Sequence, residues 1–294
     1  MNFREQFKVT ATKLFQRYKE IPLQDFNESF MIEDYYVSEK LDGVFGCVYK
    51  DTEGKVRIIS RTGEEYLSVE HLKPHLERLI NDGEFLICEL YHPMYDQPTI
   101  SGWCRDTVNQ RTMLQVFLFG LEGNSNDFET NINELHRRYV DGNFDDVHDV
   151  WLLPQLQLTS IEELKTFIAS VYDNGGEGVV LRKKTAKYKH GSKTNNIIKI
   201  KRTKTYDLEV VDVVEGKKGS KYVGMVGALK VKWKDGKTIN VSGMTDYQRN
   251  LWWDKPEEII GKIVEVRGMM DSTKGSIVQP RFKSIRHDKT EGDF

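Results

Sequence analysis

Short apolar runs rich in branched and aromatic residues predict strands through the first two thirds of the chain. These strands are expected at residues 36–37, 44–49, 56–60, 84–91, 114–121 and 178–182. Apolar positions at helical spacing predict a helix over 74–80 and another from the capping residue Ser160 to Gly175. Because strands and helices do not alternate strictly and no repeat occurs, the pattern predicts a mixed α+β domain rather than a doubly wound parallel sheet.

Two segments of this part of the chain have other patterns. The first twenty residues carry apolar positions at helical spacing, which predicts an amphipathic N-terminal helix. They lack the apolar core and small-residue cleavage site of a secretory signal. Between residues 122 and 133 the apolar pattern lapses, which predicts a polar loop.

From about Asp207 the pattern changes to short strands separated by glycine turns. Strands are expected at 208–214, 227–233, 238–241 and 262–267, with a helix between Asp246 and Trp253. About five strands in a segment of this size suit a small closed all-β barrel of the oligonucleotide-binding (OB) kind, with a sandwich as the competing fold. We place the boundary near Lys204, which divides the chain into residues 1–204 and 205–294.

Composition narrows the class of protein. With 38% hydrophobic and 30% charged residues the chain is too apolar to be disordered, and no stretch approaches the roughly 18 apolar residues of a membrane span. Membrane function is therefore excluded. Cys47, Cys88 and Cys104 form no C-x-x-C pair, which argues against a disulfide framework and a four-cysteine zinc site and favours a reducing compartment.

The near-zero net charge hides an asymmetry along the chain. Residues 181–294 contain 26 Lys or Arg and 14 Asp or Glu, whereas residues 1–180 contain 17 and 31. The densest basic stretch, residues 182–204, holds ten Lys or Arg and no acidic residue. Such a stretch matches a phosphate backbone, and a solvated loop is the alternative.

The segment Glu39-Lys40-Leu41-Asp42-Gly43 presents a lysine where a strand meets a turn that glycine permits. Taken alone, it could be an ordinary turn. Six further short segments follow it in order along the chain: 60–63, 87–90, 116–119, 177–182, 198–201 and 281–289. Together they resemble the nucleotidyltransferase superfamily of ATP-dependent DNA ligases and mRNA capping enzymes, over nearly the whole chain.

This resemblance implies an ATP-dependent DNA ligase of the compact bacterial or bacteriophage type, with an adenylation domain followed by an OB-fold domain. In such an enzyme Lys40 would take AMP from ATP and pass it to the 5′-phosphate of a nick, which the adjacent 3′-hydroxyl then seals. ATP and Mg²⁺ are expected, with Mn²⁺ as a substitute. The expected partner is nicked double-stranded DNA, and the protein is expected to be a monomer in the cytoplasm of a bacterial or phage-infected cell.

The resemblance also implies roles for single residues. Asp42 is assigned to the nucleotide sugar or to metal-assisted later chemistry, and Glu89 and Glu177 are assigned to the metal, as hard oxygen ligands. Phe119 is assigned to stacking on adenine, with core packing as its alternative. The expected nucleotide-binding set is Glu39, Lys40, Arg61, Glu89, Phe119, Glu177, Lys199, Lys201, Arg286 and Lys289.

The two lysines of Ile198-Lys199-Ile200-Lys201 are expected to act together. Residues two apart on a strand face the same side, so both lysines can reach one phosphate cluster while both isoleucines enter the core. The predicted catalytic set is Lys40, Asp42, Lys199 and Lys201.

The nucleophile needs an unprotonated amine. A free lysine has a pKa near ~10.4, so the amine is protonated at neutral pH and cannot attack phosphorus. Nearby cations lower a lysine pKa. We therefore expect Arg61, Lys199 and Lys201, with a bound metal ion, to depress the pKa of Lys40.

The expected DNA-binding residues are Arg61, Arg182 and Lys193. The family often has an arginine five residues after the nucleophile, where it contacts phosphate, and this chain has Phe45 there. Recognition of the 5′-phosphate of a nick therefore needs another cation, for which Arg61 or Lys193 is a candidate.

Several alternative functions stay open. A capping-type guanylyltransferase shares the lysine chemistry but uses GTP, and an RNA ligase fits less well because Arg286 and Lys289 resemble the last motif of DNA ligases and capping enzymes, where it orients the leaving pyrophosphate. An NAD-dependent ligase lacks its C-x-x-C zinc module here. A noncatalytic OB protein that binds nucleic acid, with an inert lysine, is the alternative outside enzymes.

Overall fold

The computed structural model describes residues 1–144, 147–271 and 276–294. Contacts between Cα atoms divide the chain into two compact units, Met1–Lys201 and Arg202–Phe294, and each is described by itself. Among the described residues, no helix is long and apolar enough to cross a membrane.

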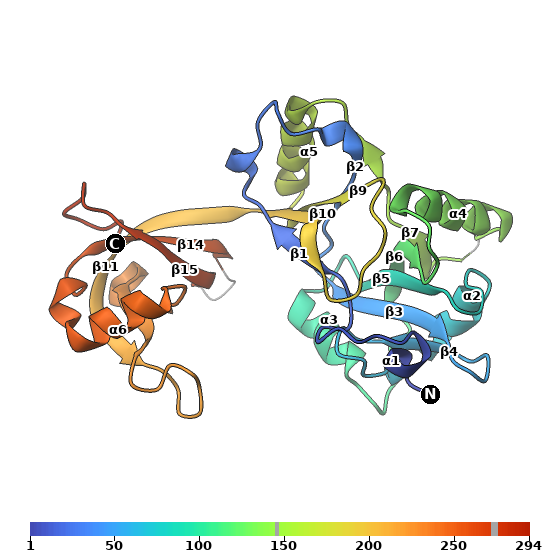
Figure 1. Ribbon diagram of the computed structural model, residues 1–294, viewed down its shortest axis with the longest axis horizontal. Helices are drawn as coiled ribbons and strands as arrows, with labels where there is room; N and C mark the ends of the chain where they lie inside the picture. Colours follow the sequence, from blue (N-terminus) through green and yellow to red (C-terminus); the bar gives the residue numbers. More distant parts are fainter. Residues whose placement is uncertain (145–146, 272–275) are drawn as a thin grey trace. The chain divides into compact units, whose positions relative to one another are not determined.

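The first unit contains two five-stranded sheets (Figure 1). One sheet has the order β4-β3-β5-β6-β7, antiparallel except for the parallel pair β6 and β7. Its strands are β3 (Val44–Lys50), β4 (Val56–Ile59), β5 (Phe85–Tyr91), β6 (Gln115–Glu122) and β7 (Val150–Leu152). The helices that accompany it are α1 (Phe3–Gln6), α2 (Lys73–Glu77), α3 (Gln97–Cys104) and α4 (Phe128–Asp141).

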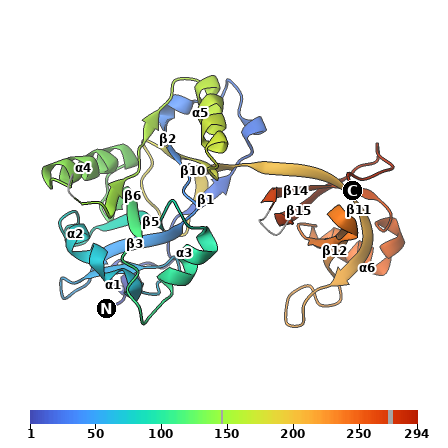
Figure 2. The same ribbon diagram turned by 180° about the vertical axis from the view of Figure 1, so that it is seen from behind.

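The second sheet of this unit has the order β1-β10-β9-β2-β8 and a separate core. Its strands are β1 (Arg17–Glu20), β2 (Tyr35–Glu39), β8 (Leu156–Gln157), β9 (Gly178–Lys183) and β10 (Lys193–Lys201). Helix α5 (Ile161–Asp173) begins at the N-cap Ser160 and lies beside β2 and β9 (Figures 1 and 2). On β10, Ile198 and Ile200 are fully buried while both neighbouring lysines are partly exposed, so the predicted alternation is confirmed.

The second unit has one five-stranded antiparallel sheet in the order β13-β12-β11-β14-β15. Its elements are β11 (Thr203–Glu215), β12 (Val226–Lys232), β13 (Thr238–Val241), α6 (Asp246–Asp254), β14 (Ile263–Asp271) and β15 (Ile277–Ile285). A parallel bridge between Ser242, which follows β13, and Arg281 of β15 joins the two edges of this sheet. The predicted small all-β domain of the OB kind is therefore confirmed as an OB-like domain.

Short 3₁₀ helices connect several of these elements. They are Leu23–Asp25, Ile32–Asp34, Leu67–Leu72, Lys234–Gly236 and Pro256–Glu258.

The predicted N-terminal helix is wrong beyond its first turn. Helix α1 ends at Gln6, and the chain then runs to β1, which pairs in parallel with β10. Phe3, Leu14 and Phe15 are buried in the core of the first sheet. These residues come from an irregular segment and are buried separately, not on one face of a helix. Their spacing in the sequence nevertheless resembles that of a helix.

The predicted loop at 122–133 is correct for residues 123–127 and wrong from Phe128 onward. Helix α4 begins inside it at Phe128, with the side chain of Asp127 capping the Thr130 amide at 2.9 Å. The helix buries Phe128, Ile132 and Leu135 and is otherwise polar. Such a narrow apolar stripe on a mostly polar sequence resembles a loop by composition.

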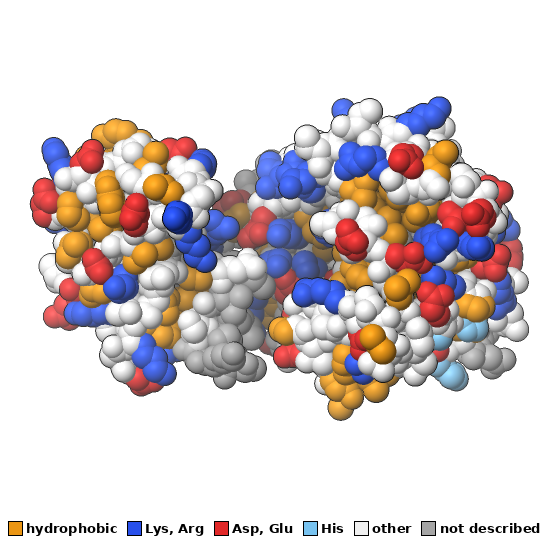
Figure 3. All heavy atoms as spheres, turned by 90° about the horizontal axis from the view of Figure 1, so that it is seen from below, with side chains coloured by type: hydrophobic (Ala, Val, Ile, Leu, Met, Phe, Trp, Pro, Cys, Tyr) orange, Lys and Arg blue, Asp and Glu red, His pale blue; other side chains and the backbone are white. Residues whose placement is uncertain are grey.

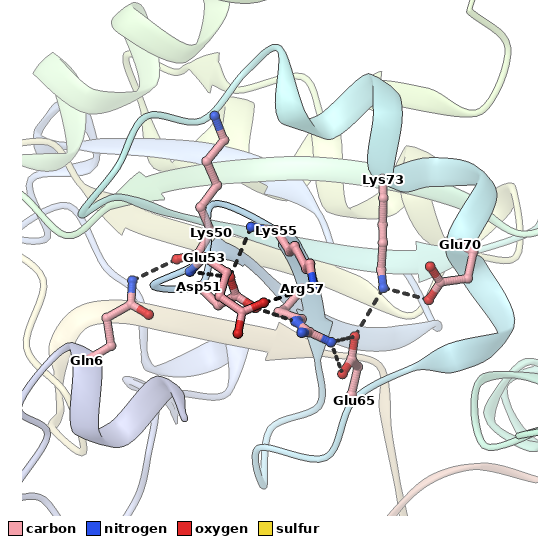
Figure 4. A network of polar contacts seen from close by, with 9 residues as sticks. All are labelled: Gln6, Lys50, Asp51, Glu53, Lys55, Arg57, Glu65, Glu70 and Lys73. Carbon is pink, nitrogen blue, oxygen red and sulfur yellow. Dashed lines mark hydrogen bonds and ion pairs between the residues drawn. The ribbon is translucent and has the colours of Figure 1, made fainter. Parts of the chain in front are cut away.

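A polar network on the surface of the first unit ties the β3–β4 hairpin to neighbouring segments (Figure 4). Arg57 lies 2.8 Å from Asp51 and 3.1 Å from Glu65, and Lys73 at the start of α2 lies 3.1 Å from the same Glu65. Gln6 donates a 2.7 Å hydrogen bond to the Lys50 carbonyl, which fastens α1 to the hairpin. This network holds the outer edge of the sheet and stands apart from the candidate site.

Substitution of Gly178, the first residue of β9, would test the close packing of the second sheet. Its φ is +148°, and a Cβ there would lie 2.1 Å from the Ile200 carbonyl oxygen. We expect Gly178→Ala to destabilise the first unit by about 2–3 kcal/mol in urea unfolding, because both the backbone conformation and the strand contact would be strained. Gly102→Ala in α3 is the control: a Cβ there has open space, and we expect a gain of about 0.5–1 kcal/mol. Equal effects of the two substitutions would contradict this account.

Candidate active site

Three neighbouring strands bring two lysines onto one carboxylate. Lys40 follows β2, Glu177 precedes β9, and Lys201 ends β10. The Nζ of Lys40 contacts Oε2 of Glu177, and the Nζ of Lys201 contacts Oε1 of the same side chain. The side chains are 17%, 8% and 13% exposed for Lys40, Glu177 and Lys201, so the triad is largely shielded from water.

Strand register explains why these three residues meet. Val179 pairs with Glu39 of β2 on one side and with Ile200 of β10 on the other. The Lys40 amide also donates a 2.8 Å hydrogen bond to the Gly178 carbonyl. The position of the lysine is therefore fixed by backbone pairing before its side chain makes any contact.

The structure corrects the expectation for the Lys40 amine. Burial alone would lower the pKa of Lys40, but the ion pair and hydrogen bond with Glu177 outweigh burial and raise that pKa above its ordinary value. The nearest charge to this amine is negative, and it favours the protonated lysine. The protein groups around Lys40 therefore do not by themselves produce the predicted depression of its pKa, for which a bound metal ion was counted as a further cause.

Glu89 lies on β5 at the same site. Within the described part of the chain its carboxylate has no hydrogen bond or ion pair, although it interacts electrostatically with Lys40 and Arg61. Burial raises the pKa of Glu89 to about 7, although these two cations act to lower it. A Cβ on Gly43 would lie 2.8 Å from the Glu89 Cγ and 2.4 Å from the Leu90 carbonyl, so glycine there permits this close approach.

A cavity opens beside the triad, with an aromatic side chain in its wall. The Phe119 side chain is 4% exposed, and the Arg182 guanidinium lies 4.5 Å from the centre of its ring. Phe119 therefore borders the cavity and also packs in the core of the first sheet, and its stacking on adenine stays a prediction. The lining residues are Tyr18, Glu39, Lys40, Leu41, Glu89, Phe119, Leu153, Val180 and Arg182.

Tyr18 of β1 is a site residue that the sequence reasoning missed. It lines this cavity and lies beneath the Arg61 guanidinium, 5.8 Å from its ring centre. The segment was assigned to a helix, and a tyrosine outside every motif gave no signal. Its role follows only from the parallel pairing of β1 with β10.

The remaining predicted residues of the first unit divide into those at the cavity and those away from it. Asp42 is exposed in the turn after Lys40, and partial burial and the Glu177 charge raise its pKa. Lys199 lies on the Lys201 side of β10, but its Nζ pairs with Glu20 at 3.0 Å and makes no contact with Glu177. Lys193 is exposed at the start of β10.

Arg182 differs from the expectation of a DNA-binding residue. Its side chain is buried, with the residue 4% exposed, and it donates a 2.9 Å hydrogen bond to the Ser38 hydroxyl. Its guanidinium packs against the Phe119 ring and does not present a charge at the surface. Arg61, by contrast, is exposed, with its guanidinium 4.0 Å from the centre of the Phe45 ring.

Arg286 and Lys289 belong to the second unit and meet around one carboxylate there. Arg286 lies 2.9 Å from Asp207 and 2.7 Å from Asp288, and Lys289 contacts Asp207 as well. The structure thus brings these two predicted residues together. Their role with pyrophosphate stays a prediction.

The donor set at the cavity suits a hard cation. Among the described residues, no cluster of three or more His, Cys, Asp or Glu forms a complete protein site for a metal. Glu89 and Glu177 nevertheless both interact with Lys40, and among the described residues the Glu89 carboxylate has no hydrogen bond or ion pair. Mg²⁺ is commonly held by one or two carboxylates together with substrate phosphates and water, so these residues fit it.

Comparison with known families agrees with this arrangement. The family model described as "ATP dependent DNA ligase domain" matches residues 14–201, which contain the triad, Glu89 and Phe119. The chain belongs to the ATP-dependent DNA ligase family. A second description, "DNA ligase OB-like domain", matches residues 215–286, so the ligase family accounts for both units.

Solved ligase structures share the fold at low identity. The structure described as "Pmar-Lig_PreS3" is 22% identical, covers 96% of this chain and 70% of its own, and has a TM-score of 0.75. One from "Structure-function analysis of Lig E DNA ligases" is 20% identical over 95% of this chain and 100% of its own, with a TM-score of 0.72. The ATP-dependent ligase of bacteriophage T7 in complex with ATP is 19% identical, covers 95% and 100%, and has a TM-score of 0.52. No curated protein matches the chain.

The unusual ionisation of Glu89 gives a testable effect on stability. Its pKa is about 7 in the folded protein against an ordinary 4.5, so the folded state holds the proton more tightly than the unfolded chain. The ionised carboxylate therefore destabilises the fold above pH 7, and this cost disappears below pH 4.5. We expect Glu89→Gln to stabilise the first unit by roughly 2 kcal/mol at pH 8 and by almost nothing at pH 4.5, measured by urea unfolding.

The exposed Glu64→Gln serves as the control and should change stability little at either pH. A gain for Glu89→Gln that is the same at both pH values would show that the carboxylate does not titrate in this way.

Proposed function

We propose that the protein is an ATP-dependent DNA ligase that seals nicks in duplex DNA through AMP carried on Lys40. The observation that carries this proposal is the Lys40 amine, held by Glu177 at the wall of a cavity that Phe119 also lines. Family membership supports the same chemistry. A noncatalytic binder would have no need for a largely buried lysine at such a cavity.

The aromatic and charged walls suggest how ATP would bind. Phe119 offers a π-face to adenine, and Val180 lines the same cavity from β9. Glu39, at the end of β2, is close to the nucleotide in this assignment. Lys201 and Lys199 extend from β10 on one side and offer positive charge to the phosphates.

The first step joins Lys40 to AMP. The amine loses its proton and attacks the α-phosphorus of ATP; a P–N bond forms, and the bond from that phosphorus to pyrophosphate breaks. Glu177 is the nearest proton acceptor in the described structure. Because Lys201 contacts the other oxygen of Glu177, that side chain still accepts a hydrogen bond from Lys201 after it has taken the proton and Lys40 has left it.

Mg²⁺, with Mn²⁺ as a substitute, would be held by Glu89 and Glu177 and would neutralise charge on the phosphates. Arg286 and Lys289 are assigned to the leaving pyrophosphate, and Asp42 to the sugar or to the later steps. These assignments follow the family resemblance.

In the second step an oxygen of the DNA 5′-phosphate attacks the α-phosphorus; a P–O bond forms, the P–N bond breaks, and Lys40 takes up a proton. In the third step the adjacent 3′-hydroxyl attacks the 5′-phosphorus, loses its proton and releases AMP. Each transfer depends on alignment and on charge stabilisation. The nicked duplex is the substrate that both late steps require, and a monomer would suffice for them.

Surface charge is compatible with a nucleic-acid partner. Figure 3 shows several groups of Lys and Arg side chains on the drawn face of the first unit, with Asp and Glu side chains between them. Lys193 is one exposed lysine of the basic stretch at 182–204. Basic groups of this kind bind phosphates without reading sequence.

The test is transfer of label from ATP. We expect the protein with Mg²⁺ and [α-³²P]ATP to retain label after denaturation and to release it onto a 5′-phosphorylated nick, which becomes sealed. Lys40→Ala should reduce labelling by ~10³-fold or more, about 4 kcal/mol of barrier, because no other amine lies at this position. Lys165→Ala on the exposed face of α5 is the matched control.

Label from GTP instead of ATP would favour the capping alternative, and sealing only of nicks with an RNA strand would favour an RNA ligase. Absence of label from either nucleotide, or full labelling of Lys40→Ala, would refute the proposal.

A further inference from the structure

A second cavity of the first unit also borders Glu89, and several polar groups are among its lining residues. Its walls come from the start of β3, the turn after β4, strand β5 and helix α3. The lining residues are Gly43, Val44, Phe45, Ser60, Arg61, Thr62, Tyr66, Glu89, Gln97, Ser101, Cys104 and Arg105. The sequence analysis gave Arg105 no role.

Two guanidinium groups, those of Arg61 and Arg105, line this cavity. Within the described residues, neither Arg61 nor Arg105 forms an ion pair, and both residues are exposed. Arg105 donates a 2.5 Å hydrogen bond to the Ser101 hydroxyl, which orients it from the end of α3. Ser60 and Thr62 add two hydroxyls, 3.0 Å apart.

The cavity adjoins the nucleophile. Glu89 lines both this cavity and the one at Lys40, and its carboxylate interacts with the cations on the two sides, Lys40 and Arg61. It is the sole carboxylate among the lining residues. An anion in the cavity would lie close to AMP on Lys40.

The substitution at Phe45 fits the same arrangement. This residue stands where the family often has a phosphate-contacting arginine, and the Arg61 guanidinium lies over its ring at 4.0 Å. A cation over an aromatic face is held in place without losing its hydrogen-bond donors. Stacking on Phe45 therefore positions Arg61. The second guanidinium of the cavity is that of Arg105, at the end of α3.

We propose that this cavity binds the terminal 5′-phosphate of the nicked strand, with Arg105 as the second guanidinium beside Arg61. The inference rests on the proposed ligase function and names the residues that select a phosphorylated nick. Two guanidinium groups with nearby hydroxyls match a phosphate monoester dianion better than a lysine point charge does. The bound phosphate oxygen then attacks the α-phosphorus of the Lys40 adenylate, and the P–N bond breaks as described above.

ATP carries the same chemical group, so the experiment must separate the two sources of phosphate. Single-turnover rates are measured for labelling of Lys40 by ATP and for transfer from labelled protein to a 5′-phosphorylated nick. We expect Arg105→Ala to slow the transfer by ~10-fold or more, the effect of one charge-assisted contact, and to leave labelling within about twofold. Arg137→Ala, on the exposed face of α4, should change neither rate.

A binding measurement that needs no catalysis accompanies these rates. Fluorescence anisotropy in EDTA compares a nicked duplex carrying a 5′-phosphate with the same nick carrying a 5′-hydroxyl. We expect the unmodified protein and Arg137→Ala to prefer the phosphate by about tenfold, and Arg105→Ala to lose this preference, with partial recovery in Arg105→Lys.

The outcomes separate the two proposals. An unchanged phosphate preference in Arg105→Ala would overturn the proposed role of this cavity. An equal loss of labelling and transfer would also overturn it, and would assign the cavity to the phosphates of ATP. Absence of labelling in the unmodified protein would refute the ligase function, while the anisotropy comparison would still report whether the cavity selects a 5′-phosphate.

Discussion

The shared carboxylate of Glu177 is the interaction on which the candidate site depends. A largely buried carboxylate between two lysines is stable only while the charges compensate one another, because a lone ion in a shielded site is strongly disfavoured. The triad carries two positive charges and one negative charge. The triad itself therefore has an excess of one positive charge, although Glu39 and Glu89 add carboxyl groups at the same cavity.

In the proposed mechanism, the same contact holds the Lys40 amine in its unreactive, protonated form before the reaction. A protonated amine has no free electron pair with which to attack phosphorus. Lys201 gives the carboxylate a second partner, so the loss of the Lys40 proton does not leave Glu177 unpaired. Stability of the resting site and readiness for the reaction thus come from one arrangement of three strands.

Much of this architecture could be predicted from local sequence. The strands that carry Glu89 and the paired lysines follow from apolar runs and strict alternation, since Ile198 and Ile200 are buried while Lys199 and Lys201 are not. The turn after Lys40 is also where the sequence predicts it, although Gly43 is required there by its close approach to Leu90 and not by a positive φ. These features depend on neighbours in the chain, which a sequence displays directly.

The remainder depends on contacts between distant segments. The role of Tyr18 follows from the parallel pairing of β1 with β10, and the burial of Arg182 from its packing against Phe119. The true start of α4 was hidden because its apolar stripe is narrow. The raised pKa of Lys40 was not anticipated, because the prediction counted nearby cations and a bound metal ion and omitted the carboxylate that touches the amine.

The most direct test is an NMR titration of the Lys40 amine in the ATP-free protein. Lysine labelled with ¹⁵N at Nζ is used, and the signal is assigned by its absence in Lys40→Arg. The account predicts a pKa above the ordinary 10.5, which falls when Glu177→Gln removes the negative partner. A pKa at or below the ordinary value, or one that Glu177→Gln leaves unchanged, would contradict the central role of the shared carboxylate.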